Sequence, residues 1–207
     1  MFKLINGIFY SEHDLDLDHE TILQEVIDSR KKPQPSKHNS RPHQHEVPDE
    51  HHTFYEDTNL YDKTYDTVSK AVSNIIDGIF GKEMMYADEI WGHIIPPGEQ
   101  TMVHNHGDIF NVEIGLSWVY YPHAVEKAGD LCFVSNINGK EYFYKTTHTK
   151  AKLFMFSNYI YHFTPRNASK IDRVSISGNH FAENKLRNIL ADDDRCENPY
   201  WKYSGRM

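Results

Sequence analysis

The second half of this 207-residue chain is a succession of short apolar and aromatic runs separated by Gly, Pro and Asn, and this pattern constrains the fold most. Asn138-Gly139 lies between two such runs and is a strong signal for a tight β-hairpin. Short runs at this spacing predict a sandwich or barrel-like all-β body. The predicted strands cover residues 86–95, 100–104, 112–121, 130–134, 141–146, 152–156, 160–163 and 173–181.

Two amphipathic patterns precede this body. Residues 19–30 and 64–80 each place their aliphatic side chains on one stripe, which predicts two helices against one face of a sheet. Gly81 supplies a stop for the second helix. We therefore expect one mainly β domain over 1–207, with a helical and loop part at 1–83, a β core at 84–182 and a C-terminal extension at 183–207.

Composition narrows the classes of function. A net charge of −8 disfavours a nucleic-acid-binding surface, which needs clustered Lys and Arg. Two distant cysteines, no leader-like segment and no run long enough to span a bilayer predict a soluble cytoplasmic protein without a membrane contact. Five histidines lie between 38 and 52, but the prolines around them favour a solvated loop over a metal site.

Candidate metal ligands follow the second predicted strand, in His104-Asn105-His106-Gly107-Asp108. Residues two apart on an extended backbone point to the same side, so His106 and Asp108 can aim at one point, and His104 can also reach it. His162, in a distant aromatic strand, is the candidate third ligand. Two imidazoles and one carboxylate leave open positions that suit Fe(II) with O₂ and an organic co-substrate.

An anion site is predicted one hairpin later. Arg173 and Ser175 share one face of the last predicted strand, eleven residues after His162. A guanidinium fork beside a hydroxyl is a good receptor for a carboxylate. A dicarboxylate could therefore bridge the metal and Arg173.

These elements resemble the Fe(II)/2-oxoglutarate-dependent dioxygenase superfamily over residues 86–181. The resemblance implies a double-stranded β-helix (jelly roll), Fe(II), and 2-oxoglutarate and O₂ as co-substrates. It implies that Arg173 and Ser175 bind the distal carboxylate of 2-oxoglutarate, with succinate and CO₂ as products beside a hydroxylated or otherwise oxidised substrate.

The chain is also similar to a smaller bacterial and phage-type group of that superfamily. His104-x-His106, Tyr120-Tyr121, Phe156-Ser157, His162 and the run from Arg173 to Asn179 match that group. Gly107-Asp108 departs from it, so the ligand beside His106 is either Asp108, which we favour, or His104. Tyr120 is the candidate for a further contact to 2-oxoglutarate, against a role in the core, and Trp91 and His93 are either core or pocket wall.

Two other functions compete with the dioxygenase. A cupin-like metalloenzyme would use His104, His106 and His162 without 2-oxoglutarate, and a jelly-roll binding module would have no catalysis. The substrate is a peptide or small molecule that the sequence does not specify. The loops at 108–113, 122–128 and 38–52 are candidates for contacting it, and a homodimer is a candidate assembly.

Overall fold

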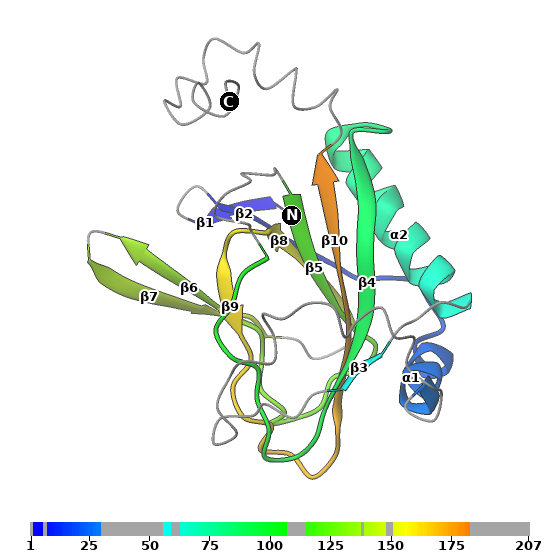
Figure 1. Ribbon diagram of the computed structural model, residues 1–207, viewed down its shortest axis with the longest axis vertical. Coiled ribbons are helices and arrows are strands. Elements are labelled where there is room, and N and C mark those ends of the chain that lie inside the picture. Colours follow the sequence, from blue (N-terminus) through cyan, green and yellow to red (C-terminus); the bar gives the residue numbers. More distant parts are fainter. Residues whose placement is uncertain are drawn as a thin grey trace, which may run out of the picture.

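The computed structural model describes residues 2–5, 8–29, 56–58, 63–106, 115–137, 139–147 and 151–182. In this part of the chain two antiparallel sheets face each other, with both helices on the outside of the larger one (Figure 1). The elements are β1 (Phe2–Ile5), β2 (Ile8–His13), α1 (His19–Ser29), β3 (Glu56–Thr58), α2 (Lys63–Phe80), β4 (Met85–Ile95), β5 (Gly115–Tyr121), β6 (Cys132–Ile137), β7 (Lys140–Lys145), β8 (Lys152–Ser157), β9 (Tyr161–Phe163) and β10 (Arg173–Ala182).

The large sheet has the strand order β1-β2-β8-β5-β10-β4-β3, and the small sheet has the order β7-β6-β9. β8, β5 and β10 are neighbours in the large sheet but are not consecutive in the chain. The strands between them in sequence, β6, β7 and β9, lie in the small sheet, so the chain passes from one sheet to the other as a double-stranded β-helix requires. The predicted fold class, mainly β with flanking helices, is confirmed.

Both predicted helices are present, and their ends follow from the sequence. The carboxylate of Asp18 accepts a hydrogen bond from the backbone N–H of Thr21, which caps the start of α1. Gly81 has a φ of 98° and donates its N–H to the carbonyl of Asp77, so it ends α2 as predicted. Neither of these helices is long and apolar enough to cross a membrane.

Three strands were not predicted. Strands β1 and β2 pair with each other and extend the large sheet beyond β8, and β3 pairs with β4 at the opposite edge. The N-terminal part is therefore not only helix and loop. Asn6-Gly7 lies between the two apolar runs that form β1 and β2, and this hairpin signal could have revealed them.

One predicted strand is wrong. Residues 100–104 form no regular strand, and a single bridge joins His104 to His162. The pairing is irregular there: Thr101 donates its N–H to the carbonyl of Thr164, but Thr164 donates its own N–H to the hydroxyl of Thr101 at 2.6 Å and not to a backbone carbonyl. The bridge nevertheless holds two candidate metal ligands side by side.

The large sheet buries both of its faces. On the outer face, Trp118, Tyr120 and Ile176 pack with apolar side chains of α1 and α2. On the inner face, Tyr121 and Phe156 belong to a second cluster that reaches the small sheet. Side chains alternate between the two faces along each strand, so every second side chain faces the helices and the others face the interior between the sheets.

Candidate metal and co-substrate site

Three histidines form a cluster at the border of the interior between the sheets, where His162 is buried and His106 is half-buried. One nitrogen from each of His104, His106 and His162 can be chosen so that all three lie within 4.8 Å of one another. The backbones of His104 and His162 exchange hydrogen bonds of 3.0 and 2.8 Å, and His106 donates its N–H to the carbonyl of Asn158 at 2.8 Å. The positions of all three imidazoles are therefore fixed by backbone pairing.

Hydrogen bonds also orient two of these rings. Nδ1 of His104 lies 2.8 Å from the carbonyl oxygen of Met102, and Nδ1 of His162 lies 2.9 Å from that of Ile160. A carbonyl can only accept, so Nδ1 carries the proton in both residues and Nε2 presents its lone pair. Desolvation lowers the pKa of both side chains, which keeps them neutral as metal ligands require.

Trp91 and His93 on β4 form a wall beside this cluster. The indole of Trp91 stacks on the ring of His106, with centroids 5.5 Å apart and planes 16° apart, and its Nε1 donates to Nε2 of His93. Burial, and then the nearby His104 and His106, lower the pKa of His93 to about 3. Both residues therefore lie beside the histidine cluster, and neither belongs to the apolar clusters of the core.

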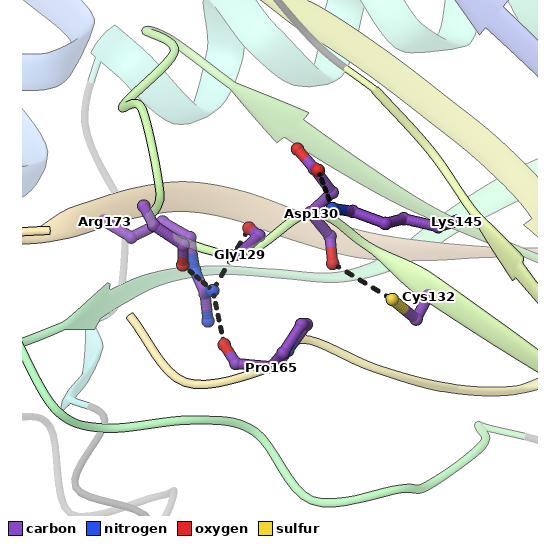
Figure 2. Close-up of polar contacts among 7 residues, drawn as sticks. Gly129, Asp130, Cys132, Lys145, Pro165 and Arg173 are labelled. Carbon is purple, nitrogen blue, oxygen red and sulfur yellow. Dashed lines mark hydrogen bonds and ion pairs between the residues drawn. The ribbon is translucent and has the colours of Figure 1, made fainter. Parts of the chain in front are cut away.

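Arg173 begins β10 on the same inner face and is 2% exposed. Its Nη1 donates to the carbonyl oxygens of Gly129 and Pro165 (Figure 2) and to that of Ala128. Its Nη2 donates to the hydroxyl of Thr164. All of these acceptors are neutral. Burial therefore lowers the pKa of Arg173, although a guanidinium stays charged in a protein.

The remaining edge of this guanidinium is the one that could receive an anion. Nε of Arg173 is buried and has no hydrogen-bond partner among the described residues. Asp130 interacts electrostatically with Arg173, but its carboxylate lies 2.9 Å from Nζ of Lys145 (Figure 2). Burying a cation with only neutral partners is costly, so a carboxylate on the Nε and Nη2 edge fits this site.

The carbonyl oxygens of Ala128, Gly129 and Pro165 form a carbonyl cradle around Arg173, and Gly129 is essential to it. Its φ is 88°, and a Cβ at this position would lie 2.5 Å from the carbonyl oxygen of Pro165 and 2.9 Å from Nη1 of Arg173. Only glycine combines this backbone conformation with so close an approach. The sequence analysis missed this residue, and Ala-Gly in a loop carried no distinctive signal.

The prediction for Tyr120 needs correction. Its side chain lies on the outer face of β5, in the core under the helices, and its hydroxyl contacts Nδ1 of His19. Alternation therefore places the neighbouring Tyr121 on the inner face, where it is 1% exposed and interacts electrostatically with Arg173. Burial raises the pKa of Tyr121 to about 12, so it keeps its proton.

The other predicted site residues divide into two groups. Ser175 lies on the inner face of β10, opposite His93 of β4 in the register, and is 6% exposed. Asp108, the favoured carboxylate ligand, lies outside the described residues, as do the loops at 108–113 and 38–52. The structure thus brings together His104, His106 and His162, with Arg173 and Ser175 on the wall of the same interior.

No protein-family model matches the sequence, and no curated protein sequence does. Solved structures do match the fold. A prolyl hydroxylase from Trichoplax adhaerens, in complex with a peptide fragment of the oxygen degradation domain of hypoxia inducible factor, is 14% identical. The match covers 87% of this chain and 86% of that chain, with a TM-score of 0.60.

Two structures that hold a metal ion and 2-oxoglutarate have similar TM-scores. HygX from Streptomyces hygroscopicus, with nickel, 2-oxoglutarate and hygromycin B bound, is 8% identical over 84% of this chain and 83% of its own, with a TM-score of 0.61. The epimerase SnoN, in complex with Fe³⁺, alpha ketoglutarate and nogalamycin RO, is 10% identical over 84% and 78%, with a TM-score of 0.60. The chain therefore shares its fold with these structures, and this fold is the jelly roll that the sequence resemblance implied.

Proposed function

We propose that the protein is an Fe(II)- and 2-oxoglutarate-dependent dioxygenase, a hydroxylase in the simplest case. The observation that carries this proposal is a cluster of three imidazoles beside the same interior as a buried arginine, which has no anionic hydrogen-bond partner among the described residues. 2-Oxoglutarate has two carboxylates and can bind both groups at once. The similarity of fold to structures that hold metal and 2-oxoglutarate supports the same function.

The residues have distinct roles in this proposal. His106 and His162 hold the metal, and the third ligand is Asp108 or His104. Arg173 binds the distal carboxylate of 2-oxoglutarate through its free edge, and Ser175 assists from the same strand face. With O₂, the iron would supply the oxidising power that converts 2-oxoglutarate to succinate and CO₂ and oxidises a peptide or small-molecule substrate.

The protein contributes geometry and a dry pocket to that chemistry. His162 and Arg173 are 4% and 2% exposed, so water is largely excluded from the base of the site. The carbonyl cradle fixes the guanidinium before the co-substrate arrives, which reduces the entropic cost of binding. Trp91 limits rotation of the His106 ring by stacking against it.

A cupin-like metalloenzyme that does not use 2-oxoglutarate is the second candidate, because three imidazoles converge without any contribution from Asp108. It would employ the same cluster and use Arg173 as a clamp for an anionic substrate. Dependence on 2-oxoglutarate separates the two functions.

The test is to purify the protein without a metal-chelating tag and titrate 2-oxoglutarate into the Fe(II) form anaerobically. We expect a visible absorption band from the iron chelate, and succinate after air is admitted. His104→Ala and Asp108→Ala are then compared for iron affinity, and the variant with the larger loss identifies the third ligand. Iron binding without a band or succinate would favour the second candidate, and no iron binding would refute both.

A further inference from the structure

Strand β7 is an edge strand of unusual exposure. It pairs with β6, and no other described strand lies along its second edge. Tyr142 and Phe143 are 48% and 64% exposed, and the β6–β7 hairpin extends away from the large sheet (Figure 1). Open edges with exposed aromatic side chains are sites where another strand can pair.

The hairpin register determines which backbone groups of β7 are available. Ile137 pairs with Lys140 across a two-residue turn, and such a turn is closed by a hydrogen bond between these two residues. Hydrogen-bonded and non-hydrogen-bonded pairs alternate along an antiparallel ladder. The backbone groups of Lys140, Tyr142 and Tyr144 therefore face β6, and those of the residues between and after them face outward.

We propose that β7 pairs antiparallel with β7 of a second copy of this chain, with the two-fold axis at Phe143. In this register Phe143 lies opposite its own copy, and Glu141 lies opposite Lys145 on both sides of the axis. All three outward-facing residues of each strand then have a partner. A shift of two residues in either direction places Glu141 or Lys145 opposite Phe143 and removes both charge pairs.

The resulting interface would join the two small sheets into one continuous sheet. Phe143 and Tyr161 flank Val134 in the register, so the partner's Phe143 would extend an exposed aromatic row. β9, which carries His162, lies at the far edge of the small sheet. The interface is therefore separate from the metal cluster and independent of the proposed function.

Sedimentation velocity of the full chain over a concentration series tests this pairing. Two six-residue strands bury less than the roughly 1,200 Å² of a standard interface, so we expect a dimer that dissociates on dilution. Glu141→Lys places two lysines opposite each other at both ends and should give a monomer, and it leaves the Lys145–Asp130 ion pair in place. The double variant Glu141→Lys/Lys145→Glu restores opposite charges and should restore the dimer.

Cysteine cross-linking tests the register. Hydrogen-bonded partners have Cα atoms about 5.5 Å apart, within the range of a disulfide, so Phe143→Cys should form a covalent dimer under mild oxidation. Glu141→Cys is the matched control and should not, because position 141 lies opposite Lys145 of the partner subunit and pairs with Asn136 within its own hairpin. Thermal unfolding and iron binding of each variant verify that it is folded.

Three outcomes would overturn the proposal. They are a monomer at every concentration, a dimer that Glu141→Lys leaves intact, and cross-linking through position 141 rather than 143. The first outcome would leave the β7 edge to a strand from a different protein. None of them bears on iron or 2-oxoglutarate binding.

Discussion

Replacement of Arg173 by methionine tests the co-substrate site most directly. Methionine approximates the length of the side chain and removes the charge and all hydrogen-bond donors. A charge-assisted hydrogen bond contributes about 1.5–3 kcal/mol, and Arg173 offers a carboxylate two donors on its free edge. A loss of about 2.8 kcal/mol corresponds to a 100-fold weaker binding of 2-oxoglutarate.

This loss can be measured as ligand-induced stabilisation of the Fe(II) protein under anaerobic conditions. At a 2-oxoglutarate concentration 100 times the dissociation constant, the folded wild type gains about 2.7 kcal/mol. A variant that binds 100-fold more weakly gains about 0.4 kcal/mol at the same concentration. For a chain of this size, these gains correspond to increases in Tm of roughly 5–11 °C and about 1 °C.

Each variant is compared with its own ligand-free protein, because Arg173→Met also leaves the carbonyls of the cradle without a donor. Arg166→Met is the matched control, since this arginine is exposed and lies only seven residues away. It should retain the full increase in Tm. An unchanged increase in Arg173→Met would refute the assignment of the carboxylate site and leave this arginine with a structural role only.

Three further predictions concern other parts of the fold. Nδ1 of the buried His180 accepts a hydrogen bond from Nε1 of Trp118, and burial lowers the pKa of His180 to about 4. The contribution of this neutral imidazole to the free energy of unfolding should be complete above pH 6.5, and the free energy should fall by up to about 3 kcal/mol between pH 6.5 and 4. Calorimetry over pH should show a shallower fall in His180→Gln, and an unchanged slope would contradict this origin. Gly129→Ala should lower the free energy of unfolding by at least about 1–2 kcal/mol from its φ alone, and it should weaken 2-oxoglutarate binding. If the variant unfolds in denaturant and binds 2-oxoglutarate as the wild type does, the role of Gly129 in the carbonyl cradle is contradicted. Cu(II) or Co(II) should quench tryptophan fluorescence in the wild type and much less in Trp91→Phe, and equal quenching would place the metal away from His106.

Local patterns in the sequence were sufficient for most of the fold. The stripe of Ile22 and Val26 and the stop at Gly81 defined the two helices, and alternation defined the inner strands. The failures were at the edges of the sheets. Strand β3 has only three residues, Glu56–Thr58, of which only Thr58 favours a strand, so its pairing with β4 depends on tertiary contacts.

The site was predictable where chemistry was encoded in spacing and not where it depended on the register of the sheet. The interval between His162 and Arg173 was visible in the sequence. The choice between Tyr120 and Tyr121 was not, because both are buried aromatic residues of one strand and only the orientation of β5 separates them. Gly129 and Thr164 support Arg173 through contacts between loops that are distant in sequence.

Alternation along β10 explains why core and site depend on each other. Val174 and Ile176 pack toward the helices, while Arg173 and Ser175 lie on the interior face of the same strand. Insertion of one residue at the start of β10 would exchange the two sets. The guanidinium would then enter an apolar core without its carbonyl partners, so selection for a packed helix face also maintains the position of the arginine that we assign to the co-substrate.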